Sequence, residues 1–163
     1  TGKTMGRGDE HPEGMYPPVV HIVIFRPDGR MLIQQRQSFK KGWPNYWDIS
    51  VGGSAQTGED SPTAAMRETR EELGLTVDLT GRRPTLTNCS GGAFDDVYIL
   101  ELPVELSELR LQPEEVQSAA FATQEEIFAM IDDGRFIPYL KSFIMLLFDL
   151  HRRGGMVDCS KKK

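Results

Sequence analysis

Three glutamates and one arginine crowd into six consecutive positions of the chain, as Arg67, Glu68, Glu71 and Glu72. On a helix these glutamates share one face, and carboxylates three or four positions apart repel one another. Hard divalent cations prefer such a set of carboxylate oxygens, so a metal ion would turn the repulsion into binding energy. Carboxylates also serve as general bases. The alternative is a solvated acidic face, which is the commoner origin of a charge cluster.

The segment from Gly52 to Gly74 has the signals of a glycine turn followed by one helix. Ser61 and Pro62 predict the N-cap and the first helical position, because proline has no amide hydrogen to lose there. Gly74 follows Leu73 and supplies a left-handed exit. Small and apolar side chains form the opposite, core-facing side at Ala65, Met66, Thr69 and Leu73. We expect the Gly52 carbonyl to face the acids, at a turn that brings backbone close to a ligand.

The spacing of these residues resembles the signature of the Nudix hydrolase family, G-x5-E-x7-R-E-U-x-E-E-x-G-U, in which U is aliphatic. Gly53, Glu59 and the run from Arg67 to Leu75 match it at every fixed position except Thr69. The Thr69 hydroxyl can donate to the Ala65 carbonyl one turn earlier, so we expect a local structural adjustment without loss of activity.

The resemblance extends beyond the signature, from His21 to Leu75. The LIQQR and YWDISVGG runs look like the Nudix subgroup related to isopentenyl-diphosphate isomerase. The resemblance implies an α/β fold, the Nudix α/β/α sandwich with a mixed β-sheet between helices. We expect one domain over residues 1–163, with an irregular lead-in over residues 1–18 and a solvated tail over residues 154–163.

The resemblance also implies a reaction and a metal. The three glutamates of the run would hold Mg²⁺ or Mn²⁺ together with the Gly52 carbonyl. Arg67 would orient a glutamate, with Glu59 as its structural partner. The base that accepts a proton from water would be Glu68 or an acid from a later loop. The expected reaction is hydrolysis of a diphosphate linkage in a nucleoside diphosphate derivative or a related organic pyrophosphate.

Further site residues are expected outside the signature. Several Nudix hydrolases supply one more acid from a later loop, as metal ligand or base, and Glu115 or its neighbour Glu114 is the candidate; a solvated charge is the alternative. In Nudix-like proteins an arginine at the place of Arg36 commonly faces the substrate phosphates, which suit bidentate guanidinium contacts. A surface salt bridge is the alternative for Arg36. Trp43 and Tyr46 form either packing or a stacking wall for a base.

Two other functions stay open. The isomerases need a catalytic cysteine, but the run from Asp48 to Ser54 has valine and glycines where it would fall, which disfavours isomerisation. A non-catalytic nucleotide-binding module would keep the fold without the chemistry; its usual mark is a degenerate signature, and this signature is intact. The identity of the substrate would depend on the flanking loops, Gln37–Tyr46 and Cys89–Asp96.

Hydrophobic alternation and turn residues predict the remaining elements. The predicted strands are Val19–Phe25, Met31–Gln35, Asp48–Val51, Val77–Leu79, Pro84–Asn88, Val97–Leu102 and Ala119–Phe121. Thr123 and Glu126 form a capping box that begins a helix ending at Gly134, and Pro138 opens a last helix that reaches Leu150.

The composition narrows the class of partner. The 163 residues carry a net charge of −5, with 39% hydrophobic and 26% charged residues, as in an ordinary globular protein. Without a basic stripe, this charge argues against nucleic-acid polymers and favours a small phosphorylated substrate bound through a cation. No apolar run approaches membrane-spanning length. Cys89 and Cys159 predict no disulfide, which suits the cytoplasm, and we expect a monomer or a homodimer.

Overall fold

The computed structural model describes residues 18–90, 93–155 and 157. The predicted lead-in, apart from Pro18, and most of the predicted tail lie outside these residues. The described strands form one mixed sheet and are β1 Pro18–Phe25, β2 Met31–Arg36, β3 Trp47–Asp48, β4 Val51–Ser54, β5 Leu86–Ser90, β6 Ala93–Glu101 and β7 Val116–Ala122.

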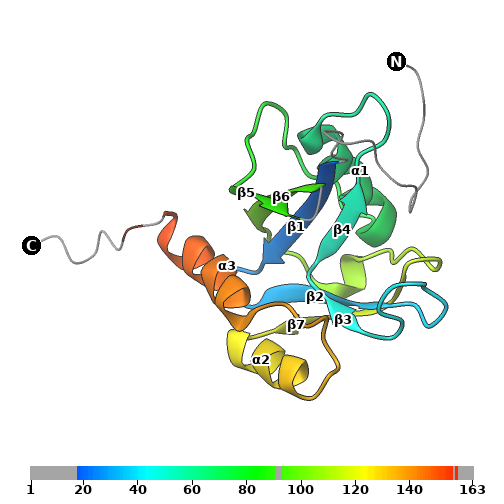
Figure 1. The fold of residues 1–163 in the computed structure, drawn as a ribbon, viewed down its shortest axis with the longest axis vertical. Coiled ribbons are helices and arrows are strands. Elements are labelled where there is room, and N and C mark those ends of the chain that lie inside the picture. The colour runs from blue at the N-terminus through cyan, green and yellow to red at the C-terminus, as the bar shows by residue number, and fades with distance from the viewer. Residues whose placement is uncertain (1–17, 91–92, 156, 158–163) are drawn as a thin grey trace, which may run out of the picture.

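Strand β1 lies at the centre of the sheet. It pairs antiparallel with β4 and parallel with β6, and β5 continues the sheet beyond β6. Strand β2 pairs with β1 at Phe25 and Met31, and it pairs antiparallel with β3 and β7. The β1 group and the β2 group therefore diverge from a shared hairpin, which Figure 1 shows as two parts of the sheet.

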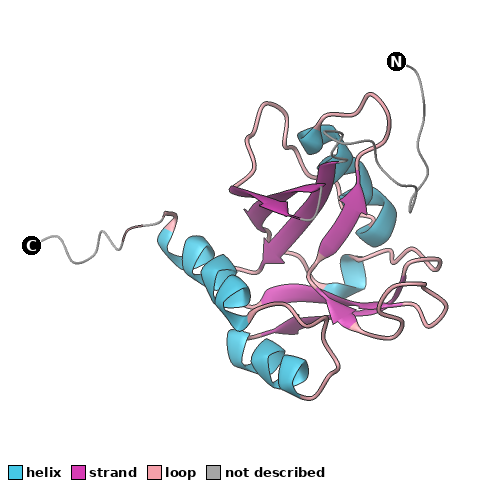
Figure 2. Ribbon diagram, viewed as in Figure 1, coloured by secondary structure: helices cyan, strands magenta, loops and turns pink. Residues whose placement is uncertain are grey.

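Helices cover both faces of this sheet (Figure 2). The described residues form α1 Ser61–Leu73, α2 Gln124–Asp132, α3 Lys141–Arg153 and a short 3₁₀ helix, η1 Leu106–Glu108. The side chains of β1 alternate between two cores: Val20 and Ile22 pack with α1, whereas Val23 and Phe25 pack with α2 and α3. The sheet lies between helices, so the predicted α/β/α sandwich is confirmed. No helix in the described part of the chain is long and apolar enough to span a bilayer.

Ser50 joins the two parts of the sheet at the point where they diverge. Its buried hydroxyl accepts a hydrogen bond from the Ile24 N–H at 2.8 Å and donates to the Leu32 carbonyl at 2.6 Å. The predicted strand Asp48–Val51 is therefore interrupted at Ser50, because its hydroxyl bonds β1 and β2 while β3 and β4 pair with different neighbours.

Two other predicted elements differ in the structure. The expected loop Cys89–Asp96 is mostly strand, because β5 and β6 pair antiparallel with Asn88 opposite Asp95. The Asn88 amide donates to the Asp95 carboxylate at 3.3 Å, so Asp95 has a partner across the two strands. The expected strand Val77–Leu79 is coil, and Leu79 anchors it in the core beside α1.

The last helix begins at Lys141 and not at Pro138. The Trp47 N–H donates to the Arg135 carbonyl at 2.8 Å, and the Ile137 N–H donates to the Trp47 carbonyl at 2.9 Å. These bonds hold the chain before Pro138 alongside β3. The helix can begin only after the chain has left that strand.

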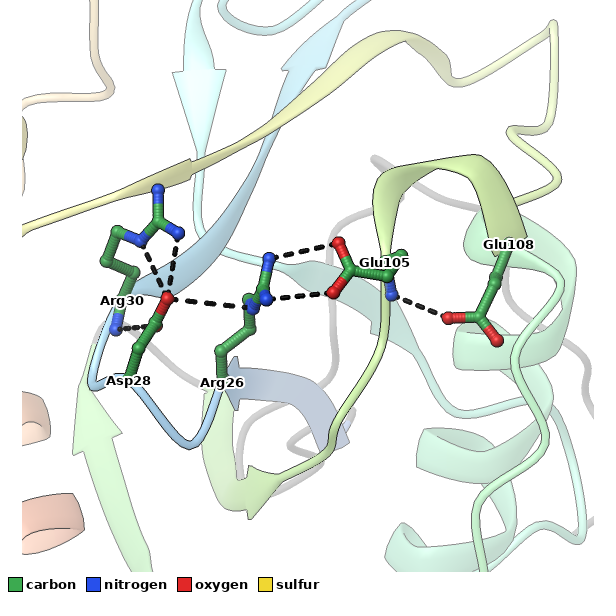
Figure 3. A network of polar contacts seen from close by, with 5 residues as sticks. All are labelled: Arg26, Asp28, Arg30, Glu105 and Glu108. Atoms are coloured by element: carbon green, nitrogen blue, oxygen red, sulfur yellow. Dashed lines mark hydrogen bonds and ion pairs between the residues drawn. The ribbon is translucent and has the colours of Figure 1, made fainter.

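A polar network fixes the turn between β1 and β2 to the segment ahead of η1 (Figure 3). The Arg26 guanidinium donates to both oxygens of Glu105, at 3.1 and 2.8 Å. The Glu105 N–H in turn donates to the Glu108 carboxylate at 2.7 Å, which closes a capping box around η1. Arg30 pairs with Asp28 within the turn. The network thus fixes η1 and the start of the segment that continues from it to the C-terminal end of α1.

Candidate active site

Helix α1 carries the acidic run, and both of its ends are capped. The N-cap is Asp60, whose carboxylate accepts from the Thr63 N–H at 3.0 Å. The N-cap prediction at Ser61 is therefore one residue late, because the Ser61 hydroxyl pairs with the Tyr98 hydroxyl at 2.9 Å instead. Gly74 has a φ of 70° and closes the C-terminal end, as predicted.

Strand β4 presents backbone directly beneath the helix. A Cβ atom built on Gly53 would overlap the Glu68 carboxyl group, so the Glu68 side chain lies in the space that any other residue would fill. Gly52 faces the other side of the sheet, where a Cβ would lie 3.4 Å from Nδ1 of His21. The absence of a side chain at Gly53 thus allows close approach between the β4 backbone and a signature carboxylate.

Arg67 forms the centre of an ion-pair network on α1. Its guanidinium donates to the two Glu59 oxygens at 2.8 and 3.0 Å and to the Ser54 carbonyl at 3.1 Å. Nη1 lies 3.0 Å from a carboxylate oxygen of Glu68 and 3.0 Å from one of Glu71. The hydrogen bond from Arg67 lowers the pKa of Glu59 and raises that of the guanidinium. Arg67 is thus a fixed positive charge between acids.

Glu72 is the buried member of the acidic run. Its side chain is only 4% exposed, although the helical pattern places it on the same face as Glu71, which is 46% exposed. The Gln34 amide donates to its carboxylate at 2.8 Å. Burial raises the pKa of Glu72 to about 8, against the effect of the Gln34 hydrogen bond and with smaller contributions from three acids, Glu68, Glu115 and Asp48.

Glu115 reaches this cluster through a segment that docks on the end of α1. The Gln112 N–H donates to the Glu72 carbonyl at 3.0 Å, which places the following turn beside the helix. The Glu115 carboxylate pairs with the Lys40 ammonium. Glu114, the other acid of the pair, is exposed. The structure therefore brings Glu115, and not Glu114, near the signature acids.

Arg36 and the buried Asp48 form a second polar group beside the cluster. The Arg36 Nε donates to the Gly42 carbonyl at 3.1 Å, and Nη1 lies 3.6 Å from Asp48. Asp48 also accepts from the Tyr139 hydroxyl at 2.9 Å and from the Ile49 N–H at 2.8 Å. Burial raises the pKa of Asp48. The Arg36 guanidinium makes internal contacts and is not part of a surface salt bridge.

Sequence reasoning missed Gln34, Asp48 and Lys40 as neighbours of the signature acids. Gln34 ends a buried run of β2, and Asp48 lies between Trp47 and Ile49. The only sign of Gln34 or Asp48 in the sequence was a polar side chain next to apolar ones. Their contacts could not be predicted, because each contact joins residues that are distant in the chain.

The donor set is that of a hard divalent cation, since it consists of carboxylates around a buried carboxylate. In the described residues, no three Asp, Glu, His or Cys side chains converge closely enough to enclose an ion in this conformation. Arg67 instead draws Glu68 and Glu71 to itself. The chemistry of the donors fits a divalent cation, and a cation held by Glu68 and Glu71 would take both carboxylates away from Arg67.

Comparisons with known proteins show the family of the chain. Residues 15–140 match the family model described as NUDIX domain. An uncharacterized Nudix hydrolase of Listeria monocytogenes is 47% identical over 150 residues, covering 92% of this chain and 88% of that relative. An isopentenyl-diphosphate Delta-isomerase of Cutibacterium acnes is 33% identical over 126 residues, covering 70% of this chain and 62% of the isomerase. A crystal structure from Deinococcus radiodurans matches with a TM-score of 0.68 at 26% identity, covering 88% of both chains. The chain therefore belongs to the Nudix hydrolase family.

Proposed function

We propose that this protein hydrolyses a diphosphate linkage with Mg²⁺ or Mn²⁺, and that its substrate is a nucleoside diphosphate derivative or a related organic pyrophosphate. Action on pyrophosphate bonds is the activity of the family to which the chain belongs. The observation that carries the metal dependence is the buried Glu72 carboxylate, with Glu68, Glu115 and Asp48 as acidic neighbours. A buried carboxylate such as that of Glu72 retains its charge only beside a cation, because an unpaired charge is costly to bury.

The proposed ligands come from three places in the chain. They are the carboxylates of Glu68, Glu71, Glu72 and Glu115 and the carbonyl of Gly52. A bound divalent cation neutralises the phosphates and lowers the pKa of a coordinated water. The docking of Gln112 on the Glu72 carbonyl supports the inclusion of Glu115 in this set.

The remaining roles concern proton transfer and orientation. Glu68 is the proposed general base, and Glu115 is the alternative. Arg67 is proposed to position Glu68, since its bidentate bond to Glu59 fixes the guanidinium before any ligand arrives. Arg36 is proposed to contact the phosphates through those N–H groups that its two internal contacts leave available.

The decisive experiment compares neutral variants of single acids. A panel of nucleoside diphosphate derivatives with Mg²⁺ or Mn²⁺ first identifies a substrate by phosphate or mononucleotide release. Glu71→Gln, Glu72→Gln and Glu115→Gln are then expected to lose at least about tenfold in kcat/KM, as removal of one transition-state contact commonly costs. Glu114→Gln is the matched control and should keep full activity. Full metal-dependent turnover by Glu71→Gln or Glu72→Gln would show that the assignment is wrong.

Isomerisation is a second candidate because of the similarity to an isopentenyl-diphosphate Delta-isomerase. The run from Asp48 to Ser54 has valine and glycines where the resemblance to the isomerases would place a catalytic cysteine, and none of these residues offers a thiol. Incubation with isopentenyl diphosphate, followed by chromatography, separates the two reactions. Dimethylallyl diphosphate as product would favour the isomerase, and calorimetric binding of nucleotide without any turnover would favour a non-catalytic module.

A further inference from the structure

The loop after β2 holds a tryptophan in a conformation that bulky residues rarely adopt. Trp43 has a φ of 52° and Asn45 has a φ of 64°, and these are the only non-glycine residues with positive φ in the part of the chain that the structure describes. The left-handed region is unfavourable for a large side chain, and such strain persists only where the surroundings impose it. The Trp43 side chain is nevertheless 46% exposed, so burial of its ring does not account for the strain.

Hydrogen bonds from two neighbouring strands impose this conformation. The Gln35 amide donates to the Asn45 carbonyl at 3.0 Å, and the Gln117 amide donates to the Asn45 side chain at 3.0 Å. The Arg36 Nε bonds the Gly42 carbonyl, immediately before the tryptophan. The loop is therefore held on both sides of Trp43, and the exposed ring has a defined position.

The Trp43 ring is in contact with a second aromatic ring of the same loop. Trp43 and Tyr46 meet edge to face, with centroids 5.2 Å apart and planes at 63°. An edge-to-face neighbour restricts the rotation of the indole without covering the whole of its surface. The same loop carries Phe39, which is 67% exposed.

The base of the loop adjoins the proposed catalytic acids. Lys40 pairs with Glu115, and Arg36 lies 3.6 Å from Asp48, one of the acids that raise the pKa of Glu72. The end of β2 and the loop after it therefore combine cations beside the acids with an exposed aromatic ring. A nucleoside phosphate needs this combination, because its phosphate seeks cations and its base offers a flat π-face.

We infer that Trp43 is the stacking platform for the nucleobase of the substrate. The inference rests on the proposed function and narrows the substrate to compounds that contain a nucleoside. Because every base has a π-face, the platform predicts binding of several bases with similar affinity.

The test uses the fluorescence of Trp43 itself. The chain has two tryptophans, so Trp47→Phe leaves Trp43 as the sole indole. With Mg²⁺ present, AMP, CMP, GMP and UMP are each expected to quench this fluorescence with saturation. Ribose 5-phosphate, which has the same sugar and phosphate without a base, is the matched ligand and should not quench it. Equal responses to both kinds of ligand, or none to either, would overturn the inference.

A second measurement does not depend on the Trp47 substitution. In otherwise unaltered protein, Trp43→Ala is expected to weaken inhibition by the nucleoside monophosphates about tenfold, a loss typical of one stacked base. Inhibition by ribose 5-phosphate should stay unchanged, because this ligand has no base. Trp43→Phe should recover part of this difference, and Phe39→Ala should reproduce the unaltered protein. An equal loss for both ligands in Trp43→Ala would show a structural role and contradict the platform.

The variant Trp43→Gly tests whether the loss of nucleotide preference is independent of the backbone strain at position 43. Glycine accepts a φ of 52° freely, so this variant should be at least as heat-stable as Trp43→Ala while it loses the same preference for nucleotides. Turnover of diphosphates with unaltered nucleotide inhibition in Trp43→Ala would overturn the platform and leave the proposed function standing. Quenching by nucleotides without turnover of any diphosphate would support the platform and overturn the proposed function.

Discussion

At Gly53 the lack of a side chain is a requirement of the site more than of the fold. We predict that Gly53→Ala lowers kcat at least about tenfold, since a Cβ there overlaps the Glu68 carboxyl group and displaces it. The free energy of unfolding should fall by only about 1 kcal/mol, because the overlapped atoms end a side chain that can turn away. Steady-state kinetics and thermal denaturation measure the two effects.

Gly52→Ala is the matched control for this substitution. Its Cβ would lie 3.4 Å from the His21 ring, on the other face of the strand, and its backbone carbonyl is retained. A loss of activity in Gly52→Ala as large as that in Gly53→Ala would contradict the close approach of Glu68 to β4 as the cause.

Glu72 makes the stability of the metal-free protein depend on pH. The pKa of its carboxyl is about 8 in the folded protein against an ordinary value of 4.5, so the unfolded chain releases this proton first. Folded-state stability therefore falls as pH rises from about 4.5 to about 8, and the fall from this group levels off above that range. The size of this fall is up to about 5 kcal/mol, since each pKa unit corresponds to about 1.4 kcal/mol.

Glu72→Gln isolates this contribution. In EDTA, the variant should gain stability relative to the unaltered protein as pH rises from 5 to about 8.5, because glutamine stays neutral and other groups titrate alike in both proteins. Urea denaturation at several pH values gives the comparison. A stability difference that is the same at every pH would mean that Glu72 is not held as a raised-pKa carboxyl.

At the scale of elements, the entry into α1 depends on Asp60. We predict that Asp60→Ala lowers the free energy of unfolding by about 1 kcal/mol, because the Thr63 N–H loses its acceptor. Asp60→Asn should retain most of the stability, since asparagine caps helices about as well. Urea titrations of the three proteins measure the free energy of unfolding. An unchanged midpoint in Asp60→Ala would indicate that Ser61, and not Asp60, caps the helix.

Local contacts of α1 could be predicted from the sequence, whereas its distant partners could not. The Thr69 hydroxyl donates to the Ala65 carbonyl at 2.7 Å, as expected, because residues four apart on a helix are always neighbours. The Gln34 amide meets Glu72 across 38 positions of the chain. Helical periodicity alone places Glu72 beside its exposed neighbours, and only the packing of β2 against the helix shows that it is buried.

The same limit explains the errors in element bounds. The capping box of Thr123 and Glu126 is present as predicted, because both of its hydrogen bonds lie within one turn. The predicted start of α3 was wrong, because hydrogen bonds with Trp47, which is far away in sequence, hold the chain before the helix. Strand pairing decides whether such a segment joins a helix or lies along a strand, and it is set by register and not by composition.

At the scale of the whole molecule, cations of the protein itself occupy the acids that the proposed metal would need. Arg67 pairs with Glu68 and Glu71, and Lys40 pairs with Glu115. These pairs allow a chain with a net charge of −5 to fold with its acids together before any metal binds. A divalent cation at this site would replace these internal partners, so its binding energy should appear as added stability.

We therefore predict that Mg²⁺ stabilises the protein through Glu72 and Glu115 together. A ligand that binds only the folded state adds about 2.7 kcal/mol at one hundred times its Kd, which raises Tm by several degrees in a domain of this size. Glu72→Gln and Glu115→Gln should each remove most of this increase, whereas Glu114→Gln should retain it, because Glu114 is exposed and Glu115 adjoins the buried acid. Thermal scans with increasing Mg²⁺, and with Na⁺ at matched ionic strength, make the comparison without any substrate. If Glu115→Gln kept the full increase, the cation would be held by the helix alone, and the docked segment after η1 would have no part in binding it.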